Sequence, residues 1–310
     1  MVNQIKVFAP ATVANVTCGF DVLGFAIDAP GDELILNLNN TGTVRITKIT
    51  GDDGKLPLEP SKNTAGAAIL SMLNFLGSTQ GVDIVLHKKM PFGSGLGSSA
   101  ASAAASVVAL NHLLNIGLSK QELVSFAMDG ESVASGSKHA DNVAPAVFGG
   151  CTLVRGYNPL DIVPIPTPEN LYCSIILPDI EINTKEARAM LSPTVKLSDA
   201  ITQWGNLAGL IAGFMSHDYG LISRSMQDII IEPIRSKLIP GFNQIKQSAL
   251  DCGALGAGIS GSGPATFALS KDEATAHDVA TAMQKACQIN GLSSKTYVSK
   301  INNVGTRILD

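Results

Sequence analysis

Charged residues are scarce in this sequence, and no part of it is strongly basic. Lys, Arg, Asp and Glu make up 15% of the 310 residues, and the formal net charge is −4. An average soluble domain carries about 25% charged residues, and nucleic-acid-binding domains usually present a basic face. Disorder requires few apolar residues, whereas 45% of these residues are hydrophobic. The composition therefore predicts a folded protein with a large core and no nucleic-acid partner.

Cysteine motifs and membrane-spanning runs are lacking as well. The five cysteines are dispersed and none forms a CxxC pair, which argues against a zinc knuckle or a disulfide framework. The first ten residues hold no apolar run of signal-peptide length. The longest uncharged stretch begins at Met90, but it is rich in Gly, Ser and Ala, so we interpret it as loop and helix. We expect a cytoplasmic protein that does not bind a membrane.

Strand and helix patterns are mixed along the chain, which favours an α+β fold over a parallel doubly wound sheet. Alternating residues predict strands at 4–8, 33–38, 43–49, 82–87, 171–177, 265–269 and 295–300. Helical spacing predicts helices at 63–76, 98–114, 184–191, 197–215, 220–227, 241–251 and 274–290. A further helix is expected after Ser119, which forms a capping-box pattern with Glu122.

The connecting segments suggest where the chain divides. Residues 142–154 are expected to form a loop that leads into a strand, and 253–264 a glycine-rich turn. Residues 158–170 contain four prolines, and proline disfavours both helix interiors and central strands. This segment is the best linker candidate, so we expect two domains, 1–165 and 166–310.

The most informative segment is a glycine- and serine-rich loop between a predicted strand and a predicted helix. Gly93, Gly95 and Gly97 tolerate backbone conformations that a Cβ would forbid, and they let backbone amides approach a ligand closely. The first N–H groups of the following helix lack intrahelical partners, and the helix dipole adds partial positive charge there. Strand, loop and helix in this order predict an anion site. The alternative is a flexible turn ahead of an alanine-rich helix.

Three segments resemble the motifs of the GHMP kinases, in the same order along the chain. Residues 9–24 resemble the first motif in its homoserine kinase version, and 256–264 resemble the C-terminal motif. The galactokinase signature is absent. The resemblance implies an N-terminal α/β domain and a ferredoxin-like C-terminal domain, with the active site in the cleft between them. The loop that resembles the ATP-binding motif consists of Pro91, Phe92, Gly93, Ser94, Gly95, Leu96, Gly97, Ser98, Ser99, Ala100 and Ala101.

The resemblance implies ATP as the phosphate donor and Mg²⁺ as its counter-ion. Ser99 and Glu131 match the metal-binding positions, and their oxygen atoms suit Mg²⁺. Asn63 matches a residue that contacts adenine. Asn142 lies eleven residues beyond Glu131, where mevalonate kinases carry a catalytic Asp. An amide cannot accept a proton near pH 7, so the resemblance implies that Asn142 orients the substrate hydroxyl, without a strong protein base.

The resemblance also implies an amino acid acceptor, L-homoserine, on the route to threonine. Asp21 would suit its ammonium group, and two arginines would suit its carboxylate. The alternatives are another GHMP kinase, acting on mevalonate or a sugar, and an ATP-binding regulator without turnover. Homodimers are common in the family, and the sequence leaves the oligomeric state open. The expected substrate-binding residues are Asn15, Asp21, His139, Thr184, Arg188, Arg235 and Gly261.

Overall fold

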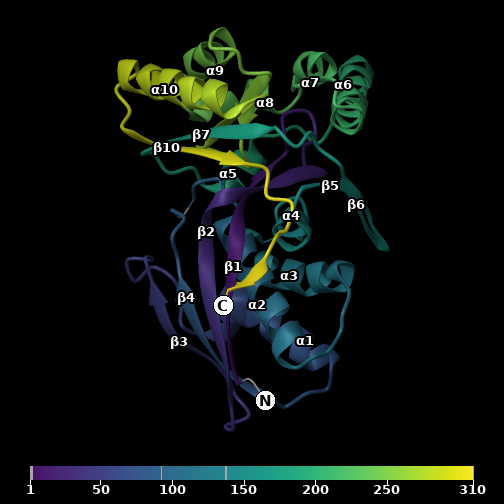
Figure 1. Cartoon of the computed structure of the whole chain (residues 1–310), viewed down its shortest axis with the longest axis vertical. Coiled ribbons are helices and arrows are strands. Elements are labelled where there is room, and N and C mark those ends of the chain that lie inside the picture. The colour runs from purple at the N-terminus through teal and green to yellow at the C-terminus, as the bar shows by residue number, and fades with distance from the viewer. Residues whose placement is uncertain (1–2, 92, 137, 310) are drawn as a thin grey trace.

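Two sheets organise the structure, which is a computed structural model that describes residues 3–91, 93–136 and 138–309 (Figure 1). Within these residues the larger sheet has seven strands; its path is β11-β1-β2-β4-β3, and β5 and β6 extend it from β2. Its strands are β1 (Gln4–Ala14), β2 (Leu23–Asn39), β3 (Val44–Thr50), β4 (Gly81–His87), β5 (Cys151–Tyr157), β6 (Leu160–Ile165) and β11 (Arg307–Leu309).

Four helices pack on the larger sheet: α1 (Thr64–Phe75), α2 (Ser98–Leu113), α3 (Lys120–Ser135) and α4 (Val143–Phe148). Helix α2 lies against β1 and β2 and contacts α1 and α3. Its run of alanines is fully or almost fully buried. Small side chains let this helix approach the strands closely, and it lies between the sheet and the neighbouring helices α1 and α3 (Figure 1).

The smaller sheet has the order β10-β7-β9-β8 and is antiparallel throughout. Helices α9 and α10 pack against it, and α6 and α7 form a pair beside it (Figure 1). Its strands are β7 (Tyr172–Pro178), β8 (Gly256–Ile259), β9 (Thr266–Ser270) and β10 (Ser294–Lys300). The remaining helices are α5 (Thr184–Ala189), α6 (Leu197–Ser216), α7 (Tyr219–Ser225), α8 (Glu232–Arg235), α9 (Phe242–Asp251) and α10 (Glu273–Ile289).

The strand order confirms the expected α+β class and the ferredoxin-like second part. Within it, the chain runs strand, helices, strand, strand, helix, strand, and the first strand, β7, lies between β10 and β9. The capping box of Ser119 and Glu122 is present at the start of α3. The division at residues 165 and 166 stays a prediction, and the last strand, β11, lies in the larger sheet beside β1.

Three connecting segments differ from the sequence expectation. The proline-rich stretch does not form a plain linker, because 160–165 form β6, which pairs with β5 and with no other strand of the described chain. Proline is tolerated there because an edge strand leaves one row of backbone groups unpaired. Residues 143–148 form α4 instead of a loop, and 256–259 form the buried strand β8 instead of a turn.

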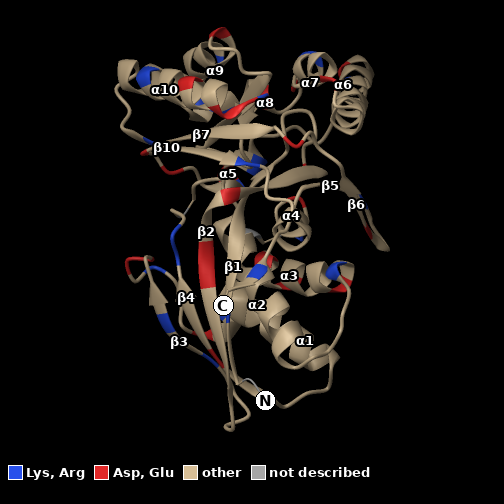
Figure 2. Cartoon of the chain, viewed as in Figure 1, with Lys and Arg blue, Asp and Glu red and all other residues tan. Residues whose placement is uncertain are grey.

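Charges are spread thinly over the fold. In the view of Figure 2, acidic and basic positions are interspersed over both sheets and their helices. No helix within the described residues combines the length and the apolar character needed to cross a membrane.

Candidate active site

The glycine-rich loop connects β4 to the N-terminus of α2, and its glycines are required by conformation and by space. Gly93, Gly95 and Gly97 have φ angles of 58°, 78° and 67°, a region that favours glycine. A Cβ on Gly97 would clash with Thr12 Oγ1, and a Cβ on Gly95 would clash with the carbonyl oxygen of Ser260. The loop therefore packs between β1 and the turn after β8. Phe92 lies outside the described residues.

A cavity of about 320 Å³ opens at this loop and at the first turn of α2. The N-cap residue, Gly97, makes no side-chain capping bond, so no side chain caps the first-turn N–H groups there. The cavity fits the anion site predicted from the sequence. Ala100 and Ala101 are instead fully buried within α2. The predicted site residues that line the cavity are Asn63, Gly93, Ser94, Gly95, Leu96, Gly97, Ser98, Ser99, Glu131, Asn142, Thr184 and Gly261.

Ser99 and Glu131 meet at the wall of this cavity. The Ser99 hydroxyl donates a hydrogen bond of 2.9 Å to Glu131 Oε1. Burial raises the pKa of Glu131 to about 7, although the Ser99 bond and the charge of Lys88 oppose the shift. No group of three or more His, Cys, Asp or Glu that could hold a metal is present among the described residues. Mg²⁺ takes few protein ligands when phosphates and waters complete its shell, so these two oxygen donors fit it.

Asn63 serves as the N-cap of α1. Its Oδ1 accepts a bond of 3.1 Å from the Ala65 amide, and its Nδ2 donates a bond of 3.1 Å to the Pro57 carbonyl. The side chain is buried at the cavity wall. Both ends of the amide therefore hold the backbone that shapes the cavity, and the adenine contact stays a prediction.

Asn142 is held by a residue that the sequence reasoning missed. The Thr12 hydroxyl, fully buried in β1, donates a hydrogen bond of 2.7 Å to Asn142 Oδ1. This bond fixes the amide oxygen toward β1 and leaves the NH₂ group as the donor of the side chain. Thr12 lies within residues 9–24, which resemble the first family motif, but its residue type alone gave it no role apart from the core.

The first-motif segment, residues 15–21, has an unusual backbone. Asn15, Val16, Thr17 and Asp21 have φ angles of 72°, 40°, 62° and 61°, which are uncommon for residues other than glycine. Such conformations persist where the surroundings fix them. Asn15 Nδ2 donates a bond of 2.8 Å to the Gly261 carbonyl, and Asn15 Oδ1 accepts one of 3.1 Å from the Asp21 amide. The segment is thus tied to the C-terminal motif.

Charged side chains from distant segments meet beside this loop. Arg188, on α5, pairs with both carboxylate oxygens of Asp21, with Nη1 at 3.2 Å from Oδ1. His139 Nδ1 lies 4.0 Å from Asp21 Oδ1. Arg235 is 4% exposed and donates a bond of 3.0 Å to the Gly261 carbonyl. Within the described chain, Arg235 Nε and His139 Nε2 are buried without a hydrogen-bond partner.

The environment shifts the protonation of this cluster. Burial lowers the pKa of His139, although the charge of Asp21 opposes the shift; the imidazole is therefore neutral at pH 7. Burial and the charge of Asp21 raise the pKa of Asp141 to about 7. Burial also lowers the pKa of Arg235. The cluster holds two guanidinium groups beside acidic groups, which is an arrangement suited to a zwitterion.

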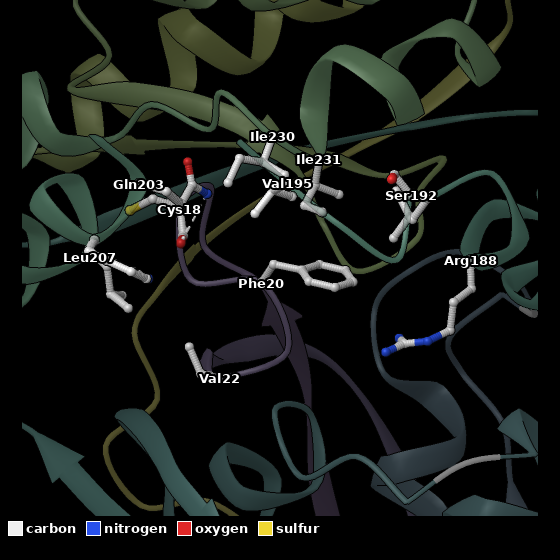
Figure 3. A pocket seen from close by; sticks show the side chains of 12 residues that line it. Cys18, Phe20, Val22, Arg188, Ser192, Val195, Gln203, Leu207, Ile230 and Ile231 are labelled. Atoms are coloured by element: carbon white, nitrogen blue, oxygen red, sulfur yellow. Dashed lines mark hydrogen bonds between the residues drawn. The ribbon is translucent and has the colours of Figure 1, made fainter. Parts of the chain in front are cut away.

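Phe20 lies against both arginines and, together with Arg188, lines a mostly apolar cavity. Its ring centroid lies 5.5 Å from the Arg188 guanidinium carbon and 4.9 Å from that of Arg235. Figure 3 shows Phe20 with Arg188 on one side and Val195, Ile230 and Ile231 on the other. This second cavity has a volume of about 560 Å³ and mostly apolar walls. Arg235, which is also buried, therefore lies in a low-dielectric setting that strengthens its attraction for an anion, whereas the Arg188 side chain is 41% exposed.

Comparisons with known proteins agree with this geometry. The model for the GHMP kinases N terminal domain matches residues 63–150, and the model for the GHMP kinases C terminal matches residues 210–289. A homoserine kinase of Chloroherpeton thalassium is 47% identical, over 99% of this chain and 100% of the relative. A homoserine kinase of Chlorobaculum tepidum is 49% identical, over 97% of each chain.

A solved structure agrees as well. The crystal structure of homoserine kinase from Cytophaga hutchinsonii has 55% sequence identity and a TM-score of 0.97, and the match covers 100% of this chain and 98% of that chain. The matches span the whole chain, including the loop, the first-motif segment and the charged cluster. The chain therefore belongs to the homoserine kinases of the GHMP kinase family.

Proposed function

We propose that this chain transfers the γ-phosphoryl group of ATP to the hydroxyl of L-homoserine, giving ADP and O-phospho-L-homoserine, a step toward threonine. The observation that carries the proposal is that the uncapped N-terminus of α2 and a charged cluster of buried Arg235 with partly buried Arg188 and Asp21 lie on either side of the turn at Gly261. The full-length similarity to homoserine kinases supports the same substrate pair.

The nucleotide is assigned to the cavity at the glycine-rich loop. Backbone amides of the loop and of the first turn of α2 bind the phosphates, because they are donors beside the positive end of the helix dipole. Ser99 and Glu131 would hold Mg²⁺, which neutralises charge on the transferred phosphoryl group. Ionised Glu131 is required for this task, and a bound cation would favour that form.

The amino acid is assigned to the charged cluster. Arg235 contributes a buried Nε that lacks a partner, and Arg188 contributes the guanidinium group now paired with Asp21. A carboxylate bound between the two arginines would gain charge-assisted hydrogen bonds in a low-dielectric setting. Asp21 is then available to the substrate ammonium group. The substrate zwitterion replaces contacts that the cluster now makes with itself.

Transfer requires orientation more than proton removal. Phosphoryl transfer proceeds through a loose transition state, so the attacking hydroxyl needs little activation at the start. The Asn142 NH₂ group, fixed by Thr12, donates to the hydroxyl oxygen or to the γ-phosphate. Neutral His139 lies beside the cluster and presents its buried Nε2 there.

A substrate panel tests the proposal directly. Purified protein with ATP and Mg²⁺ is incubated with L-homoserine, mevalonate or galactose, and ADP release is measured. We expect release with L-homoserine alone. Release with mevalonate or galactose in its place would assign the chain to another GHMP kinase activity, and binding of ATP without turnover on any acceptor would favour a regulator.

A further inference from the structure

A fully buried ion pair adjoins the glycine-rich loop, with Lys88 at the wall of the 320 Å³ cavity, and neither residue is among the groups assigned to ATP, Mg²⁺ or the acceptor. Asp32, on β2, pairs with Lys88, which follows β4. Their side chains are 4% and 2% exposed. Burying two charges is unfavourable unless each is fully hydrogen-bonded, so the bonds that surround this pair indicate what it does.

Asp32 directs all its hydrogen bonds to the two flanks of the loop. Its Oδ1 accepts bonds of 2.7 Å and 3.0 Å from the amides of Lys89 and Met90, where the loop begins. Its Oδ2 accepts a bond of 3.1 Å from the Ser98 hydroxyl, where the loop ends and α2 begins. One carboxylate therefore joins both ends of the loop.

Lys88 also forms hydrogen bonds with the N-terminal part of α2. Besides its pair with Asp32, its ammonium group donates bonds of 2.8 Å to the Ser98 carbonyl and 2.7 Å to the Ser102 hydroxyl. These three bonds use all three protons of the group. They hold the first turn of α2 through a carbonyl and a hydroxyl, so the N–H groups of that turn stay available to a ligand.

We propose that Asp32 and Lys88 are positioning residues that hold the two flanks of the phosphate loop at a fixed separation, so that the loop amides are arranged for the nucleotide before it binds. Because the opposite charges neutralise each other, the pair adds no net charge beneath an anion site. This proposal rests on the proposed function, in which the loop binds the phosphates of ATP.

The test compares nucleotide and acceptor binding in a double variant, Asp32→Asn with Lys88→Met. Removing both charges avoids an unpaired buried ion. We measure the dissociation constant of ADP by calorimetry, the KM values for ATP and L-homoserine, and the melting temperature. The ADP dissociation constant and the KM for ATP should each rise about tenfold, equal to about 1.4 kcal/mol, while the KM for L-homoserine stays within twofold.

Glu33→Gln is the matched control, because Glu33 is the next residue of β2 and pairs with Lys6 and Lys89 at the surface. It should leave ADP binding unchanged. If the folded double variant binds ADP as the wild type does, or if both KM values rise equally, the positioning role is refuted.

A second variant covers the case in which the double variant does not fold. Ser102→Ala removes one acceptor of Lys88 and places a strong helix former in α2. The ADP dissociation constant should rise about threefold, and an unchanged value would refute the proposal. Failure of the wild-type protein to bind ADP at all would instead refute the proposed nucleotide site, so the two failures are distinguishable.

Discussion

The nucleotide end and the acceptor end of the candidate site differ in the chemical groups that form them. At the nucleotide end, glycines, backbone amides and one helix N-terminus come from a single continuous segment, with Glu131 added from α3. At the acceptor end, three charged side chains, Asp21, Arg188 and Arg235, and the neutral imidazole of His139 come from four separate segments. In the proposed function, fixed dipoles would therefore bind the phosphates, and mainly charged side chains would bind the amino acid.

This difference has physical consequences. Backbone dipoles do not titrate and are fixed by the fold, so the nucleotide end depends on glycine conformation and on close packing. Charged side chains pair with each other when no ligand is present, as Arg188 and Asp21 do. Substitutions at the nucleotide end should therefore reduce both ATP binding and turnover, whereas substitutions at the acceptor end should mainly weaken binding of the amino acid.

The largest effect is expected at the nucleotide end, from Glu131→Gln. The amide keeps the shape of the side chain but cannot supply an anionic metal ligand. Turnover should fall about a thousandfold, because metal stabilisation of the transferred charge is lost, while part of the ADP binding remains. Steady-state kinetics and calorimetry measure the two. Exposed Glu169→Gln is the control, and unchanged turnover in Glu131→Gln would remove Glu131 from the metal site.

Gly97→Ala should have the next largest effect. The φ angle of 67° is strained for alanine, and the added Cβ would clash with Thr12 Oγ1. We expect kcat/KM for ATP to fall about a hundredfold, equal to about 2.7 kcal/mol. Gly54→Ala is the matched control, because Gly54 has a φ of 72° and nothing within 4 Å of its Cβ position. Equal losses in both variants would show that backbone strain alone, and not the packing of the loop, causes the effect.

Arg235→Met tests the acceptor end. The variant keeps much of the buried side chain but removes the guanidinium group proposed to bind the substrate carboxylate. The KM for L-homoserine should rise roughly thirtyfold, as expected for a lost hydrogen bond to a charged group, with the KM for ATP unchanged. Arg155→Met, at an exposed arginine on β5, should change neither. A rise in the KM for ATP would contradict the separation of the two ends.

The same contrast explains how much of the structure could be predicted from the sequence. Strand β4 and helix α2, on either side of the loop, were predicted to within a few residues, because an alternating strand pattern and a glycine-rich loop followed by an alanine-rich run are local properties. The residues proposed to bind the phosphates lie in one continuous stretch of the sequence. The acceptor residues could be named only through resemblance to a family, because an isolated Arg or Asp has no local signal that separates a site from a surface.

Tertiary bonds account for what the sequence could not predict. Thr12 reaches Asn142 across 130 positions of the chain, and Asn15 reaches Gly261 across 246. The edge strand β6 formed despite Pro164 because, among the residues that the structure describes, it is paired on one side alone. Asn63 combines a helix cap with a place on the cavity wall, so its local signal as an N-cap gives no information about adenine.

A smaller effect is expected on stability, from Asp141→Asn at the acceptor end. The folded-state pKa of about 7 exceeds the usual 3.8, so the folded protein binds this proton more tightly than the unfolded chain does. The free-energy cost of ionising Asp141 in the folded protein therefore grows as pH rises from about 4 to 7. Burial and the negative charges of Asp21 and Glu131 cause this cost, and the positive charge of Arg188 reduces it. The difference in free energy of unfolding between the variant and the wild type should increase, in favour of the variant, by on the order of 2 kcal/mol from pH 5 to pH 8.

Chemical denaturation at pH 5 and pH 8 measures this gain, with Asp129→Asn as a control on the neighbouring helix α3. Asp129 has its own partners in Ser71 and Lys138, so its replacement should not stabilise the protein more at the higher pH. A gain for Asp141→Asn that is equal at both pH values would mean that Asp141 is ionised throughout this range in the folded protein.

The smallest effect is expected from Thr12→Val. Thr12 bears on both ends of the site because its partner, Asn142, lies between them. Valine preserves the shape of the buried side chain and the strand β1, but it removes the donor to Asn142 Oδ1. A neutral hydrogen bond contributes about 1 kcal/mol, so kcat should fall about fivefold. Both KM values should stay unchanged, because only the orientation of the reacting groups is affected.

Thr152→Val is the matched control: Thr152 is equally buried, on β5, and its hydroxyl has no partner within the described residues. If both variants lower kcat alike, the hydroxyl of Thr12 does not act through Asn142, and the amide must be oriented by the backbone at the start of α4 alone.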